Sequence, residues 1–187
     1  MTVFYLFFGF LVFQRIGELI IAKRNEKLLK REGAVEFGAS HYPFIVGLHI
    51  MFFVSLLIEV AILGGGIHPF WPVILGLFLF VQGLRVWALL SLGKYWNTKI
   101  LLVPGANVIA KGPYRFLRHP NYLVVILELL LVPLLFNAYV TALLFSALNV
   151  WMLSIRIPAE EYALKEFTDY DSRHGSNSRF MPGAGRK

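Results

Sequence analysis

The chain has 187 residues, 57% of them hydrophobic, and a mean hydropathy of +0.64, which excludes an ordinary soluble domain with a wet surface. Lys and Arg outnumber Asp and Glu by 18 to 11, and because the excess is confined to a few segments it indicates membrane orientation rather than nucleic-acid binding. The absence of Cys excludes disulfides, thiolate metal sites and a cysteine nucleophile.

Five apolar segments follow one another along the chain. A bilayer core about 30 Å thick needs roughly 20 helical residues to cross it. We therefore predict an all-α, polytopic integral membrane protein that forms a single domain over residues 1–187, with transmembrane helices at 3–22, 42–63, 70–92, 121–136 and 139–157. The first segment lacks a basic leader and a small-residue cleavage site, so it is expected to be a retained helix. Residues 172–187, rich in Gly, Ser and Arg, are predicted to be a flexible tail.

The fourth segment is short for a full span and contains Pro133. Only Asn137 and Ala138 separate it from the fifth segment. A connection this short joins antiparallel neighbours, so the last two helices are predicted to form a tight hairpin.

The loops predict how the chain threads the membrane, because short cytoplasmic loops carry an excess of Lys and Arg. Basic residues gather in two loops, at Lys23, Arg24, Lys27, Lys30 and Arg31 and again at Lys94, Lys99, Lys111, Arg115 and Arg118. The turns at 64–69 and at Asn137 contain no Lys or Arg. The N-terminus is therefore expected outside, and both basic loops and the C-terminus in the cytosol.

Several ionisable residues lie inside the predicted spans, where a charge is costly unless it is paired or lines a polar cavity. Arg15 and Glu18 are three residues apart on one helical face, which fits either a structural ion pair or a polar cavity. Arg85 has Glu59 or Glu128 as a candidate partner on another helix. His49 is predicted to be a hydrogen-bonded interior histidine.

A second polar cluster lies in the cytosolic loop from Lys111 to Tyr122. Gly112 and Pro113 predict a turn, and Pro120 suits the first turn of the helix that follows His119. The free amides at such a helix N-terminus can bind a carboxylate or phosphate. The alternative is that the arginines are only membrane anchors and the tyrosines only interface residues.

A third polar cluster lies at the cytosolic end of the last span. Arg156 and Glu160 are four residues apart, so on a continuous helix they share a face and can hold an anion and a hydroxyl-bearing or cationic group respectively. Pro158 between them is compatible with this helix only if the helix kinks. The alternative is that Glu160 and Glu161 form a solvated helix cap.

Taken in order, these motifs resemble the isoprenylcysteine carboxyl methyltransferase family, and more distantly phosphatidylethanolamine methyltransferases and membrane sterol reductases. The resemblance covers roughly residues 92–167 and rests on the strings 112–114 and 118–122, the hydrophobic hairpin, and then Arg156, Glu160, Glu161 and Leu164. Residues 22–26, 33–36 and 40–43 are similar to a bacterial branch of the family, some members of which methylate long-chain alkylpyrones.

The resemblance implies a methyltransferase that uses S-adenosylmethionine, in a bacterial inner membrane, and no metal site. Its substrate would be a lipophilic acceptor from the bilayer, either a prenylcysteine-like carboxylate or an alkylpyrone hydroxyl, with membrane lipids as the other partners and no nucleic acid. The implied cofactor contacts are Ala106, Asn107, Val108, Ile109, Tyr114, His119, Pro120, Asn121, Tyr122 and Glu160. Arg156, the implied catalytic residue, would face the acidic group of the acceptor.

Two other functions stay open at this point. A reductase of the sterol-reductase type would keep the fold and use a nicotinamide cofactor. A small carrier or scaffold would use Glu59, Arg85 and Glu128 as a polar pathway, although no inverted repeat supports it. A soluble Rossmann-type methyltransferase is excluded because no glycine-rich nucleotide loop follows a strand.

Overall fold

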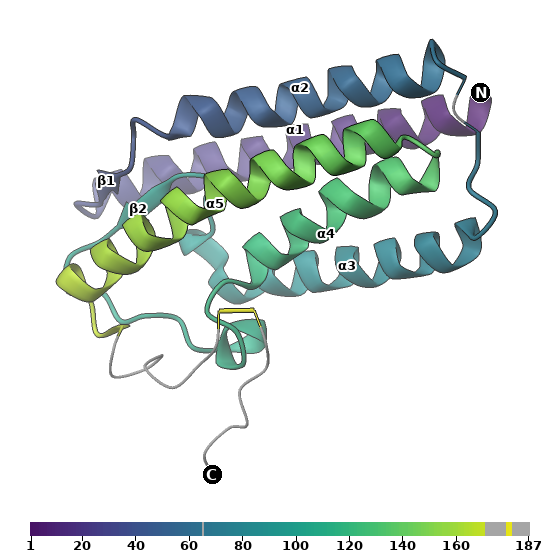
Figure 1. Ribbon diagram of the computed structural model, residues 1–187. Helices are drawn as coiled ribbons and strands as arrows, with labels where there is room; N and C mark the ends of the chain where they lie inside the picture. Colours follow the sequence, from purple (N-terminus) through teal and green to yellow (C-terminus); the bar gives the residue numbers. More distant parts are fainter. Residues whose placement is uncertain (65, 171–178, 181–187) are drawn as a thin grey trace.

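The computed structural model describes residues 1–64, 66–170 and 179–180. Over these residues the chain has five α-helices, which lie side by side in a bundle (Figure 1). The helices are α1 (Thr2–Arg31), α2 (Tyr42–Ala61), α3 (Trp71–Leu92), α4 (Pro120–Leu135) and α5 (Tyr139–Phe167). The short elements are β1 (Val35–Phe37), β2 (Ile100–Leu102) and the 3-10 turns η1 (Gly93–Tyr95) and η2 (Gly112–Arg115). The predicted tail at 172–187 falls outside the described residues except for Arg179 and Phe180.

Four of these helices are long and apolar enough to cross a membrane, namely α1, α2, α5 and α3 together with η1. This confirms the prediction of a mostly helical membrane protein. Helix α4 has 16 residues and is therefore about 24 Å long, so its passage through the whole bilayer stays a prediction. It packs against α5, and Asn137 adopts a left-handed conformation (φ 57°) in the turn that joins them, as the predicted hairpin requires.

The connections divide between the two ends of the bundle (Figure 1). The N-terminus, the α2–α3 connection and the α4–α5 turn lie at one end, which we call the packed end. The α1–α2 connection, the end of α5 and the long segment between α3 and α4 lie toward the other end, which we call the hollow end. Both predicted basic loops are therefore at the hollow end.

Two helices run further than the hydropathy predicted. Helix α1 continues past Ala22 to Arg31 because Asn25 and Leu29 continue the buried face that Glu18 and Ala22 form. Helix α5 continues through Pro158 to Phe167. The antiparallel pairing of β1 with β2, in register Glu36 with Leu101, was not predicted either, and it ties the α1–α2 connection to the segment after α3.

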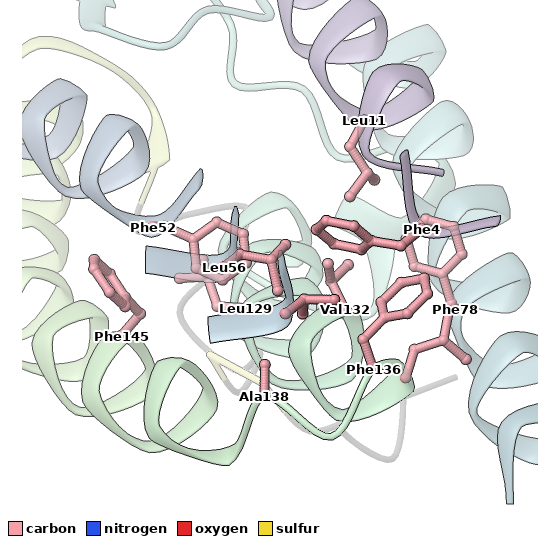
Figure 2. Packing of buried hydrophobic residues seen from close by; sticks show 12 residues of the cluster. Phe4, Leu11, Phe52, Leu56, Phe78, Leu129, Val132, Phe136, Ala138 and Phe145 are labelled. Atoms are coloured by element: carbon pink, nitrogen blue, oxygen red, sulfur yellow. The ribbon is translucent and has the colours of Figure 1, made fainter. Parts of the chain in front are cut away.

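The packed end is filled by a cluster of buried apolar side chains from all five helices (Figure 2). Phe4 of α1 meets Phe136 edge to face at 5.1 Å between ring centroids, and Phe52 of α2 meets Phe145 of α5 at 5.6 Å. Such ring pairs add roughly 1 kcal/mol each beyond area burial. In lipid, where association depends on van der Waals packing, this interlocking holds the helices together.

Four charged residues of the spans, Arg15, Glu18, Arg85 and Glu128, form one charged cluster between the two ends. Arg85 of α3 donates to both Glu18 of α1 and Glu128 of α4, and Arg15 lies 2.8 Å from Glu18. The predicted Arg15 and Glu18 pair is therefore present, and Glu128 is the partner of Arg85. Glu59 has a different role, because its carboxylate accepts from the amides of Val140 and Thr141 at 2.9 and 2.7 Å and caps the start of α5.

Candidate active site

A cavity of about 240 Å³ lies at the hollow end and reaches down to the charged cluster. Ten of the eleven residues named from the sequence line this cavity: Ala106, Asn107, Val108, Ile109, Tyr114, His119, Asn121, Tyr122, Arg156 and Glu160. Pro120 is fully buried at the first turn of α4 and is not among the lining residues. Its contact with a cofactor stays a prediction.

Arg156, Tyr122 and Glu160 form a hydrogen-bonded chain across α4 and α5. The Arg156 Nε donates to the Tyr122 hydroxyl at 2.8 Å, and that hydroxyl donates to the Glu160 carboxylate. The Arg156 Nη2 donates to the Thr98 carbonyl at 2.5 Å, whereas Nη1 makes no hydrogen bond to the described residues. The guanidinium is thus fixed on one side and keeps donors free for an anion in the cavity.

His119 is held in place by Glu161. Its Nε2 donates to the Glu161 carboxylate at 3.1 Å, and its ring stacks on Tyr122 with centroids 5.3 Å apart. Arg179 donates to the same carboxylate through Nε and Nη2, at 2.9 and 2.6 Å. Because Glu161 occupies Nε2, a ligand in the cavity would meet Nδ1 of His119.

The N-terminus of α4 opens on the cavity. His119 is the N-cap residue, and Pro120 occupies the first turn, where its missing N–H costs nothing. The backbone amides of Asn121 and Tyr122 have no hydrogen-bond partner within the described chain. They supply the anion-binding donors that the sequence predicted at this position.

The extended segment at 106–109 forms one wall of the cavity and is pinned to the end of α5. The Val108 amide donates to the Asp169 carboxylate at 2.7 Å, and the Gly105 amide donates to the Phe167 carbonyl at 3.0 Å. This segment makes few side-chain hydrogen bonds, and its backbone amides fix it in place.

The unpredicted extension of α1 positions another segment that lines the cavity, the one that follows α3. The Asn25 amide donates to the carbonyls of Gly93 and Trp96, at 3.1 and 2.7 Å. Asn97 returns a hydrogen bond to the Ala22 carbonyl at 3.0 Å. Trp96 is thereby buried against the cavity with its indole N–H unpartnered.

The turn η2 sets Tyr114 against the cavity through a close contact with α3. Gly112 has φ +59°, and a Cβ there would lie 2.0 Å from the Ser91 Oγ and 3.0 Å from the Trp87 Nε1. Only glycine fits this approach. The Tyr114 hydroxyl is buried without a partner, and burial raises the pKa of Tyr114 above its ordinary value, so the group stays a protonated donor.

Sequence reasoning missed the residues that hold the site together. Asn25, Asp169 and Arg179 act on the backbone or on another side chain, and nothing in their local sequence marks these partners. Glu161 was named only as half of an acidic pair. Trp96 and Asn149 also line the cavity, and each carries a buried donor without a partner.

The geometry defines a membrane-embedded protein with a polar cavity at one end of its helical bundle. Residues 74–166 match the model of the isoprenylcysteine carboxyl methyltransferase (ICMT) family, from within α3 to near the end of α5, and the chain belongs to this family. The resemblance stated from the motifs is therefore confirmed, and the chain is a member of a family of membrane methyltransferases.

Two relatives cover most of this chain. A protein of Bacillus subtilis (strain 168), named "Uncharacterized protein YpbQ", is 52% identical over 165 residues, which are 88% of this chain and 98% of the relative. A protein of Haemophilus influenzae (strain ATCC 51907 / DSM 11121 / KW20 / Rd), named "Uncharacterized protein", is 26% identical over 151 residues, 80% of this chain and 88% of the relative.

Proposed function

We propose that this protein transfers a methyl group from S-adenosylmethionine to an acidic oxygen of a lipophilic acceptor. The observation that carries the proposal is the cavity in which Arg156, with free donors, and the open N-terminus of α4 meet. One group suits an acidic acceptor and the other suits the carboxylate of a polar cofactor. The acceptor would be a carboxylate, as in a prenylcysteine, or an acidic hydroxyl, as in a long-chain alkylpyrone.

The buried polar groups around the cytosolic part of the cavity fit S-adenosylmethionine. Trp96 and Tyr114 offer unpaired donors, and Glu160 offers a carboxylate that accepts from Tyr122 and carries further acceptor capacity. Asn107 and Asn121, which also line the cavity, add side-chain amides. When bound, this cofactor supplies a methyl group on a sulfonium, which an oxygen nucleophile takes while the sulfur keeps the electron pair.

The chain's own contribution is positioning. Arg156 would hold the acceptor oxygen, and Tyr122 and the Thr98 carbonyl hold Arg156 so that little orientation is lost when the acceptor binds. A carboxylate is already ionised at neutral pH, so no general base is needed.

We also propose that the hollow end faces the cytosol and the N-terminus lies outside, in a bacterial inner membrane, because both basic loops are at the hollow end (Figure 1). Reporter fusions at Met1 and after Phe167 are expected to report opposite sides. Both reporters on one side would contradict this arrangement.

The test of the function is transfer of labelled methyl by the purified protein in detergent to a panel of prenylcysteines, alkylpyrones, fatty acids and amines. Label in an ester or an aryl ether of an acidic lipid is expected. A dinucleotide retained by the purified protein, with no methyl transfer, would favour the reductase instead. No retained ligand and no transfer would favour a carrier.

A further inference from the structure

The part of the cavity nearest the charged cluster, which we call the membrane end, is lined by polar side chains. A site for a plain hydrocarbon would be lined by apolar side chains instead. Arg15, Glu18 and Arg85 of the charged cluster line the membrane end, together with His49 of α2 and Asn149 of α5. Asn149 is seven residues before Arg156 on the same face of α5, so it lies about 10 Å deeper in the membrane. The two residues thus mark two polar ends of one elongated cavity.

Two hydrogen-bond donors at this membrane end are buried and unpaired. The Asn149 Nδ2 has no partner, and its residue is 5% exposed; the Arg85 Nε has none, and its residue is 4% exposed. An arginine Nε can only donate, so it requires an acceptor atom. The remaining nitrogens of Arg85 already pair with Glu18 and Glu128.

The charge of the cluster is balanced, because Arg15 and Arg85 face Glu18 and Glu128. A ligand anion would give the cluster a net negative charge, whereas a neutral carbonyl or ether oxygen would satisfy the free donors without adding charge. His49 can also accept a hydrogen bond from a hydroxyl group. Its Nδ1 donates to the Ile45 carbonyl at 2.9 Å, and its Nε2 has no partner among the described residues.

We propose that the membrane end is a second acceptor subsite, which binds a neutral, oxygen-bearing group carried within the lipid chain of the acceptor. This inference rests on the proposed function, since Arg156 is taken to hold the acidic end of the same lipid. It favours an oxygenated lipid acid over a prenyl chain, because a hydrocarbon would leave the Asn149 and Arg85 donors buried without partners.

The test compares hexadecanoic acid with oxo-hexadecanoic acids whose ketone is moved along the chain. Binding is measured as the ligand-dependent rise in unfolding temperature of the full-length protein in detergent, without cofactor. For one range of ketone positions, wild type is expected to bind the oxo acid roughly two- to tenfold more tightly than the parent acid, the effect of one hydrogen bond.

Three variants make the assignment specific. Asn149→Leu removes the amide, and Asn149→Asp keeps its size while replacing the donor group by a carboxylate; both are expected to lose the ketone preference. Ser146→Ala is the matched control, because the Ser146 Oγ on α5 is also buried without a partner, whereas Ser146 does not line the cavity. It is expected to keep the preference.

Equal binding of both acids by wild type at every ketone position would overturn the subsite, and so would a preference that survives in both Asn149 variants. The proposed function is tested separately, by the methyl-transfer assay. A ketone preference that depends on Asn149, without methyl transfer to any lipid acid or pyrone, would contradict the methyltransferase proposal and leave the subsite in place.

Discussion

The two ends of this bundle are built from the same helices and differ in what they bury. At the packed end α5 contributes Phe145 to a cluster of twelve apolar side chains. At the hollow end the same helix contributes Arg156 and Glu160 to a cavity. The comparison leads us to expect that the packed end supplies most of the stability and the hollow end the proposed chemistry, with the charged cluster between them.

The charged cluster lies where the two ends meet. Arg85 joins α1, α3 and α4 through Glu18 and Glu128, and the same residue lines the membrane end of the cavity. Removing one partner of such a group is costly because it leaves an uncompensated buried charge. The cluster therefore belongs to the scaffold and to the cavity at once.

The largest effect is expected from a substitution that disrupts the backbone at the hollow end. Gly112→Ala forces a Cβ to within 2.0 Å of the Ser91 Oγ in a left-handed backbone conformation. Overpacking and backbone strain together should cost roughly 3 kcal/mol or more. The measurement is cofactor affinity by calorimetry together with the unfolding temperature, and both are expected to fall.

Gly105→Ala is the matched control for this prediction. Gly105 also has a positive φ, of 75°, but a Cβ there meets nothing within 4 Å. It should cost only the conformational strain, about 1 kcal/mol. If the two alanines behave alike, the close approach of Gly112 to α3 does not position the site.

The next effect concerns Arg156. Arg156→Lys keeps the charge and loses the planar fork that donates to both Tyr122 and Thr98, so turnover should fall roughly 100-fold while cofactor affinity stays nearly intact. Initial rates and calorimetry measure the two quantities. Wild-type turnover in the lysine variant would make Arg156 a membrane anchor instead of a site residue.

A substitution at the packed end tests whether the two ends are energetically independent. Phe145→Leu removes the edge-to-face contact with Phe52, so it should lower the unfolding temperature and leave cofactor affinity unchanged. Loss of cofactor affinity in the leucine variant would show that the two ends are not energetically separate.

A smaller effect is expected from the side chains proposed to bind the cofactor. Alanine at His119, Tyr122 or Glu160 should weaken binding of S-adenosylmethionine by about 1 to 3 kcal/mol, the range for lost buried or charge-assisted hydrogen bonds. Calorimetry in detergent measures this. Unchanged affinity in all three variants would mean that the family's cofactor contacts do not carry over to these positions.

The smallest effect is a pH dependence from Tyr114. Burial raises its pKa, so above about pH 10 the unfolded chain releases this proton while the folded protein keeps it. The free energy of unfolding should therefore fall as pH rises past that value, by up to about 1.4 kcal/mol per pH unit. Tyr114→Phe should show a shallower fall, and identical slopes would indicate that Tyr114 is solvated.

The sequence predicts the parts of this molecule that depend on local patterns. Hydropathy located the spans, Asn137 and its short connection located the hairpin, and the order of motifs located Arg156, His119 and Tyr122. Each of these signals lies within a few residues of the feature it predicts.

The parts that the sequence did not predict depend on partners distant in the chain. The pairing of β1 with β2 joins three-residue strands that are separated in sequence by two spans. The helical extension at Lys23–Arg31 is mostly polar, and only Asn25 and Leu29 within it are buried. Glu59 was a candidate partner of Arg85, yet it caps α5. Such choices follow from packing, which local propensity does not determine.

The most direct test of the account is hydrogen–deuterium exchange of the wild-type protein with and without S-adenosylhomocysteine. The account predicts protection of the backbone at 106–109 and at the start of α4, where the Asn121 and Tyr122 amides are unpartnered, and no change at the packed end. Absence of protection at the hollow end, or protection there by a nicotinamide dinucleotide alone, would contradict it.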